Sequence, residues 1–364
     1  MTRRGPRTRP TPARFAALLV ALLAGCRATW TPSTLAPPSG LQWPFAPAAA
    51  RVTYGYALSG LSRDTSAATV LQSVVYGSSG REGAFLLPVA VATATDGRIA
   101  VADTGCACVH LYQPATSTYL RLLGSDARRM VSPVGLAFDD SGRLWVSDSA
   151  GALFAFDGEG HAAVVLQKAG DQPLQRPTGL AWSASRRRLY VVDTLAHAVR
   201  VLDPGGALER SFGSRGAGRG ELNFPTHVAI APDGDVYVAD ALNFRIAIFD
   251  DDGKPLGEFG HHGDGSGDIA MPKGIAVDAR GVVYVVDAMF DNVQLFDRTG
   301  RFLLTVGSRG TGFGEFWLPS GAFLDGKGDF HVCDTYNHRV QVFHVAGGAP
   351  AAVTGEKGDG RAAS

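Results

Sequence analysis

Apolar positions along the chain fall into short runs, and the same order of runs and polar turns returns six times. Each copy opens with a proline, crosses an apolar run to a turn rich in Asp and Gly, and continues through a second apolar run that ends in Asp. The six copies open at Pro88, Pro133, Pro177, Pro225, Pro272 and Pro319, so the period is 44 to 48 residues. A period of this length is typical of a propeller or a solenoid.

The fourth copy shows what one repeat encodes. Its segments HVAIA, DVYVAD, FRIAIFD and KPLGEFG are rich in β-branched and aromatic residues, and PDG, LN and DDGK separate them. These separators favour tight hairpin turns, so we predict four antiparallel strands per repeat. Small residues recur in the first strand, as expected where six inner strands meet at an axis: Ala90, Gly135, Gly179, Gly274 and Gly321. The sequence therefore predicts an all-β fold, a six-bladed β-propeller of four-stranded antiparallel blades.

The sixth copy stops before its fourth strand. After VQVFHVAGG (340–348) there is no apolar run, whereas VLQSVVYG (70–77) and the residues that follow it match LLTVGSRGTGFGEFWLP near residue 303. We therefore expect an N-terminal segment, 70–77, to supply the outer strand of the sixth blade, with 52–58 as a further strand. Closing the ring in this way removes exposed sheet edges, which a solenoid would not require.

The motifs of the later copies resemble the NHL repeat. The resemblance rests on PKGIAVDARGVVYVVD (272–287), on ADALNFRIAIFDDDG, and on the connectors FGSRGAGRGEL and VGSRGTGFGEF. It covers roughly residues 70–345 and is strongest in copies four to six. The usual Asn-x-Arg after the strand-ending Asp is present only as Asn243/Arg245 and Asn337/Arg339. The resemblance implies the fold but no single function, because functions are carried by sites on a fold.

The N-terminal residues predict export and lipidation. Five arginines precede FAALLVALLAG, a stretch too short for a mature transmembrane helix, and LAGC ends at Cys26 like a bacterial lipobox. We predict a signal peptide over 1–26, a Pro- and Ala-rich tether over 27–50, the propeller over 51–348 and a flexible tail over 349–364. The protein would then be exported and held in the bacterial cell envelope, periplasmic or on the outer surface, by lipid on Cys26. The alternative is an ordinary secretory signal with a chance cysteine.

Charge argues against a nucleic-acid partner. The chain has 34 basic and 34 acidic residues, and five of the arginines lie in the predicted signal, so the mature protein is slightly acidic. Nucleic-acid binding proteins usually carry a basic excess.

Three cysteines follow Cys26: Cys106, Cys108 and Cys333. The segment CACVH has one residue between its cysteines and a valine before the histidine, which excludes c-type haem attachment. In the repeat alignment Cys106 and Cys108 replace the Asn and Arg of copy six. A disulfide from Cys333, a Cys106–Cys108 bridge, a two-thiolate metal site and unpaired thiols all stay open.

One face of the propeller is the expected binding face. The blade-opening connectors and the loops after the strand-ending aspartates lie on it together. We expect those six aspartates to accept hydrogen bonds within their own blades. Positions that break the repeat on this face are better ligand-binding candidates: His227 at the axis, then Lys273, Phe290, Asp291, Trp317 and Tyr336.

Two functions follow. The first is a non-catalytic interaction module that binds an envelope protein, peptide or glycan through loops on a rigid scaffold. The second is a metal-dependent lyase or a lactonase/hydrolase with its site at the central channel, since similar six-bladed propellers include such enzymes. Calcium or zinc at His227, or at Cys106 and Cys108, belongs to that alternative. The position after each blade-opening proline holds no histidine, so we favour the first function, with no cofactor and no catalytic residue.

Overall fold

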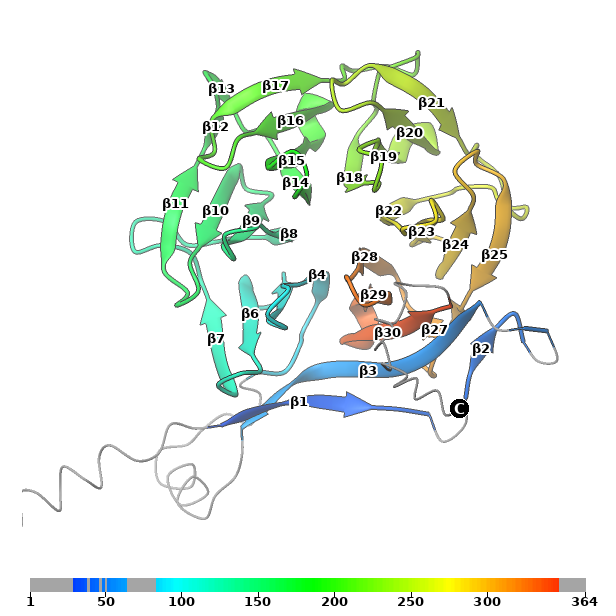
Figure 1. The fold of residues 1–364 in the computed structure, drawn as a ribbon, viewed down its shortest axis with the longest axis horizontal. Helices are drawn as coiled ribbons and strands as arrows, with labels where there is room; N and C mark the ends of the chain where they lie inside the picture. Colours follow the sequence, from blue (N-terminus) through cyan, green and yellow to red (C-terminus); the bar gives the residue numbers. More distant parts are fainter. Residues whose placement is uncertain (1–28, 38–39, 46–47, 50, 64–82, 347–364) are drawn as a thin grey trace, which may run out of the picture.

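The computed structural model of the protein describes residues 29–37, 40–45, 48–49, 51–63 and 83–346, and these form a ring of six twisted sheets (Figure 1). In five blades the strand order follows the chain from the axis outward. The predicted six-bladed propeller of four-stranded antiparallel blades is confirmed.

Blades 1 to 3 follow each other along the chain, each with its inner strand first. Blade 1 contains β4 (Pro88–Thr93), β5 (Ile99–Asp103), β6 (Cys108–Gln113) and β7 (Thr118–Leu122). Blade 2 contains β8 (Pro133–Phe138), β9 (Leu144–Asp148), β10 (Ala152–Phe156) and β11 (Ala162–Leu166). Blade 3 contains β14 (Pro177–Ser183), β15 (Arg188–Asp193), β16 (Ala198–Leu202) and β17 (Leu208–Phe212).

Blades 4 to 6 repeat the arrangement. Blade 4 contains β18 (Pro225–Ile230), β19 (Val236–Asp240), β20 (Arg245–Phe249) and β21 (Pro255–Phe259). Blade 5 contains β22 (Pro272–Val277), β23 (Val283–Asp287), β24 (Asn292–Phe296) and β25 (Phe302–Val306). Blade 6 starts with β28 (Pro319–Leu324), β29 (Asp329–Asp334) and β30 (Arg339–Val345).

Short elements lie in the connections. Two small ladders precede blades 3 and 6: β12 (Lys168–Ala169) with β13 (Gln172–Pro173), and β26 (Ser308–Arg309) with β27 (Glu315–Phe316). Single 3₁₀ turns follow three of the strand-ending aspartates: η1 (Thr194–Ala196), η2 (Ala241–Asn243) and η3 (Thr335–Asn337).

The outer part of blade 6 comes from the N-terminal side of the chain, although not from the segment expected. Strand β3 (Val52–Arg63) pairs antiparallel with β30, with Val52 opposite Val345 and Leu58 opposite Val340. It thus takes the edge of β30 that we assigned to 70–77, a segment that lies outside the described residues. The expected further strand at 52–58 is the closing strand itself.

Two more strands cover this closing strand. Strand β1 (Trp30–Leu35) pairs with β3 on its outer edge, and β2 (Gln42–Trp43) pairs with the beginning of β3. Part of the expected 27–50 tether is therefore bound to blade 6, because its apolar residues have partners there. Trp43 packs edge-on against Phe343, and Trp30 lies 4.6 Å from the ring of Tyr119 in blade 1. The N-terminal strands thus cross the seam between the last blade and the first (Figure 1).

The hydrophobic core lies between neighbouring blades. One cluster joins residues of blades 1 and 2, such as Val109 and Phe154, and another joins blades 3 and 4, such as Tyr190 and Phe249. Each blade is therefore held on both faces by its neighbours, which fixes the inner strands around the axis. Among the described residues no helix has the length and apolar character needed to cross a bilayer.

Candidate binding site at the axis of the rim face

One face of the ring carries both the blade-opening prolines and the strand-ending aspartates, because the two pair in all six blades, from Pro88 with Asp103 to Pro319 with Asp334. We call this the rim face. The six aspartates are fully buried. Asp240, for example, accepts hydrogen bonds from the Asn223 backbone, Asn243 and Arg245 at 2.5, 2.7 and 2.9 Å. Their expected role within the blades is confirmed.

The residues directly after the six prolines form a ring around the axis on this face. All of them line one cavity, the upper cavity, of about 370 Å³: Val89, Val134, Thr178, Thr226, Lys273 and Ser320. Arg176, Phe224, Leu242 and Met271 add to its wall. The repeat thus places one side chain per blade at the mouth of the channel.

The upper cavity is cationic. Lys273 and Arg176 line it, and no carboxylate of the described residues does. Burial lowers the pKa of Lys273, and the positive charge of Arg176 adds to the effect. In the described part of the chain neither side chain forms an ion pair. Two cations without a counter-charge favour an anionic ligand.

The hydroxyl groups of the upper cavity are already used across the ring. Thr226 Oγ1 donates to the Pro272 carbonyl at 3.1 Å, and Ser320 Oγ donates to the Val89 carbonyl at 3.1 Å. Thr178 Oγ1 lies 2.8 Å from Thr194 Oγ1, which donates to the Pro225 carbonyl. These bonds connect neighbouring inner strands, so the polar side chains of the upper cavity that are left to hold a ligand are the two cations and His227.

His227 closes the channel below the upper cavity. Its counterparts are Ala90 and four glycines, and a Cβ on Gly179 would lie only 2.5 Å from the His227 Cα. The inner strands approach too closely at this level for several side chains, and His227 is the one large exception. Its imidazole has no hydrogen-bond partner among the described residues. Burial, with a smaller effect of Lys273, lowers its pKa to about 4, so the ring is neutral at pH 7.

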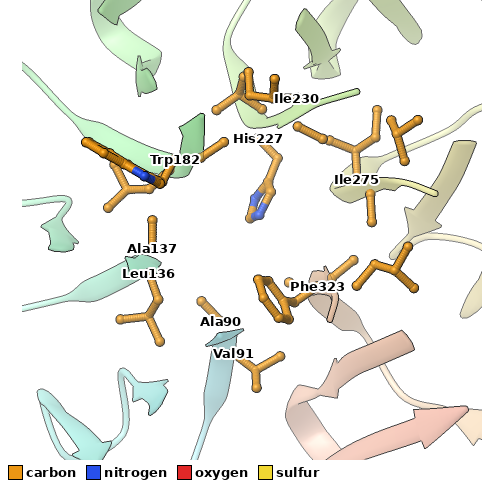
Figure 2. Close-up of a pocket in the computed structure, with 18 of the residues that line it drawn as sticks. Ala90, Val91, Leu136, Ala137, Trp182, His227, Ile230, Ile275 and Phe323 are labelled. Atoms are coloured by element: carbon orange, nitrogen blue, oxygen red, sulfur yellow. The ribbon is translucent and has the colours of Figure 1, made fainter. Parts of the chain in front are cut away.

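Beneath His227 lies a second cavity, the lower cavity, of about 290 Å³, and most of the residues that line it are apolar. Figure 2 shows His227 pointing into its centre, with Trp182 and Phe323 on the wall. Trp182 Nε1 is buried and has no hydrogen-bond partner within the part of the chain that the structure describes. The neutral imidazole of His227 therefore lies on the axis between the cationic upper cavity and the lower cavity.

Exposed apolar side chains recur on the rim face, and one of them, Leu242, lines the upper cavity. Four follow the strand-ending aspartates by two residues, and three precede the blade-opening prolines by two. They are Leu195, Leu242, Met289, Tyr336, Leu86, Val131 and Trp317, and they make up seven of the eleven large apolar side chains exposed in the described residues. We call them the apolar rim. Large apolar surfaces of this kind mark interaction sites.

Of the ligand-binding residues predicted from the sequence, the structure places some at the upper cavity and others away from it. His227 and Lys273 line the upper cavity, whereas Phe290, Asp291, Trp317 and Tyr336 do not. Trp317 and Tyr336 are exposed, with ring centroids 5.8 Å apart, and belong to the apolar rim. Asp291 is buried and accepts a hydrogen bond from the Leu318 backbone at 2.6 Å, which gives it a structural role. Half-buried Phe290 follows the exposed Met289.

Arg176 was not predicted as a site residue from the sequence. It is the residue just before a blade-opening proline, a position that is apolar or small in the other copies, and this departure was the signal available.

The cysteines form a separate group. Cys106 and Cys108 are joined by a disulfide, and Cys333 is free and buried. Cys106, Cys108 and His110 form the single cluster of three metal-ligating side chains in the described residues, and it lines neither axial cavity. His227 therefore has no second metal ligand beside it among these residues.

Comparison with known proteins identifies the repeat and the fold. The NHL repeat model matches residues 222–249 and 316–343. No curated protein matches the sequence. A gluconolactonase from Xanthomonas campestris is 19% identical over 72% of this chain and 86% of its own, with a TM-score of 0.55. Virginiamycin B lyase from Staphylococcus aureus is 12% identical over 71% and 95%, with a TM-score of 0.52.

A streptogramin B lyase structure is similar to the same extent, at 10% identity over 70% of this chain and 78% of its own, with a TM-score of 0.53. At these identities the likeness extends to the fold alone. The protein is thus a six-bladed β-propeller in which two segments match the NHL repeat.

Proposed function

We propose that the protein is a membrane-anchored, extracytoplasmic binding module that receives an acidic segment of a protein or peptide partner on its rim face. The observation that carries the proposal is the pair of cations, Lys273 and Arg176, in an upper cavity that no carboxylate of the described residues lines. Lys273 is half-buried and Arg176 is exposed. Partial burial of an unpaired ammonium group costs some stability, so the presence of Lys273 at this position supports a ligand that pairs with it.

The apolar rim restricts the kinds of partner that the rim face can bind. Leu195, Leu242 and Met289 are aliphatic and are exposed on the rim face. They would contact and bury apolar side chains of the partner, while its carboxylate enters the upper cavity beside Lys273 and Arg176. A polypeptide end, with apolar residues before a terminal carboxylate, offers both features, whereas a neutral glycan offers neither.

The test is peptide binding to the full-length protein in detergent. A set of labelled apolar peptides is compared with free-carboxylate and carboxamide ends, by fluorescence anisotropy at two salt concentrations. We expect the carboxylate peptides to bind at least tenfold more tightly, more weakly at high salt, and to lose that preference in Lys273→Met. Lys327→Met, an exposed lysine in the turn between β28 and β29 on the opposite face, is the matched control. No preference for the carboxylate, or equal effects of both substitutions, would overturn the proposal.

The membrane anchor is a separate part of the proposal. Cys26 lies outside the described residues, and the lipobox-like LAGC is its support. Cys26→Ser should move the protein from the membrane fraction to the soluble extracytoplasmic fraction. Retention in the membrane by this variant would contradict lipidation at Cys26.

A metal-dependent enzyme at the channel is the alternative function. The lyases and the gluconolactonase share its fold, but in the described residues His227 is the one histidine, cysteine or acidic residue that lines either cavity. One metal-ligating side chain is too few for a zinc or calcium site. Metal-dependent turnover that is lost in His227→Gly would favour the enzyme.

A further inference from the structure

The loop that leads into β6 differs from its counterparts in chemistry. In blades 4 and 6 the third and fifth residues after the strand-ending aspartate are Asn and Arg, and both bind that aspartate. In blade 1 the same positions hold Cys106 and Cys108, and the seventh position holds His110. His110 is buried, and its Nε2 lies 3.5 Å from Asp103 Oδ2. Two sulfur atoms and an imidazole thus stand in blade 1 in place of the arginine clamp, the Asn and Arg that bind the strand-ending aspartate in blades 4 and 6.

The donors converge on one point. Cys106 Sγ and Cys108 Sγ each lie 3.7 Å from His110 Nε2. Bonds of about 2.3 Å to sulfur and 2.0 Å to nitrogen at a tetrahedral angle give a sulfur–nitrogen edge of about 3.5 Å. The imidazole thus lies near the separation from each sulfur that a shared zinc ion requires. The two sulfurs are bonded to each other in the disulfide, so they must move apart after reduction to bind zinc together.

The surroundings orient the imidazole for this role. His110 Nδ1 lies 2.9 Å from the Tyr119 hydroxyl, so in the tautomer with its proton on Nδ1 that proton can be donated to the hydroxyl oxygen. In this tautomer Nε2, which otherwise faces Asp103 Oδ2 at 3.5 Å, offers its lone pair to a metal. Phe85 packs edge-on against the ring. Gly105 is exposed and Cys106 is half-buried, which gives a path from solvent.

We propose that Cys106, Cys108 and His110 form a redox-gated zinc site, closed by the disulfide and opened by a dithiol reductant. The reductant's thiolate attacks one sulfur, the other leaves as a thiolate, and the second thiol of the reductant resolves the mixed disulfide. Two electrons reach the cysteine pair and the reductant becomes a disulfide. Zinc then binds both thiolates and Nε2, their thiol protons are released, and a fourth position stays open to water.

The test uses cobalt and zinc on the full-length protein. The oxidised protein and the phosphine-reduced protein are freed of metal and titrated with Co²⁺, and cobalt–thiolate absorption is followed. We expect one Co²⁺ per chain in the reduced protein, displaced by Zn²⁺, and none in the oxidised protein. His110→Asn should weaken binding at least tenfold, whereas Cys333→Ala and Lys273→Met should leave it unchanged. Lys273→Met thereby separates this site from the upper cavity.

Alkylation of the reduced wild-type protein gives a second measurement that needs no variant. Zinc should protect Cys106 and Cys108 from iodoacetamide, as read by mass spectrometry. Metal uptake equal in the oxidised and reduced forms, unchanged affinity in folded His110→Asn, or no protection by zinc would each overturn the proposal.

Discussion

His227 places an imidazole at a level of the channel where four other blades have glycine. The ring lies between the upper cavity and the lower cavity. Its burial and the positive charge of Lys273 both disfavour the protonated form. Its pKa of about 4 lies below the usual 6.5, so between these values the unfolded chain binds the proton that the folded chain does not. Stability that is complete above pH 6.5 must therefore fall as the pH is lowered toward 4.

His227→Gly tests this linkage, because glycine is the residue of the other blades. Between pH 7.5 and 5, the free energy of unfolding of the wild-type protein should drop by about 2 kcal/mol more than that of the variant. Urea unfolding at the two pH values measures the difference. His161→Ala, at an exposed histidine, is the control. Equal pH dependence in His227→Gly and wild type would show that His227 is not desolvated.

Lys273 is the second residue whose environment opposes its charge. Burial and the positive charge of Arg176 both lower its pKa. Lys273→Met should therefore raise the free energy of unfolding by up to about 1 kcal/mol while removing carboxylate binding. Lys327→Met should leave both unchanged. A loss of stability in Lys273→Met would reveal a structural role for the ammonium group and weaken the binding proposal.

At the scale of elements, strand β3 closes the ring. It lies between β1 and β30, and Ala57 faces Leu35 on one side and Gln341 on the other. Ala57→Pro removes a buried backbone donor from this ladder and should lower the free energy of unfolding by about 2 to 3 kcal/mol. Ser33→Pro, in the edge strand β1 at its register shift, should cost less than about 1 kcal/mol. Similar costs for both in thermal or urea unfolding would contradict closure by β3.

The arginine clamps are the other element-scale feature. Arg245 binds buried Asp240 and also three carbonyls of the connector, those of Ala217, Gly218 and Glu221. Arg245→Met leaves that carboxylate without its cation and should destabilise by about 3 to 5 kcal/mol. Arg200 lies 3.9 Å from Asp193 in the equivalent sheet of blade 3, and Arg200→Met should cost much less. Equal losses of unfolding free energy in the two variants would show that the distance between the arginine and the aspartate does not decide the stabilisation.

The blades could be predicted from the sequence because their turns and apolar runs repeat six times. The closing strand was misassigned, since β3 breaks its alternation at a register shift between Tyr54 and Tyr56. A bulge of this kind has no signal in an apolar pattern. The segment 70–77 was preferred because it and the residues that follow it match LLTVGSRGTGFGEFWLP near residue 303.

For the whole molecule, the ring brings residues far apart in the sequence to one axis. His227 and Lys273 were predicted because they break the repeat at known positions. Arg176 and the two cavities were not, because the width of the channel depends on how closely the inner strands approach each other. His110 was missed for a related reason: the strand geometry, and not the spacing alone, turns it toward the two cysteines.

The central claim is that the rim face binds an acidic partner. The most direct measurement is site-specific photocrosslinking in cells that produce the full-length protein, with the crosslinker at Leu242 on the apolar rim or at Leu256 on outer strand β21. The account predicts one discrete adduct from position 242, lost in Lys273→Met and kept in Lys327→Met, and no such adduct from position 256. An equal adduct at both positions, or one that persists in Lys273→Met, would contradict it.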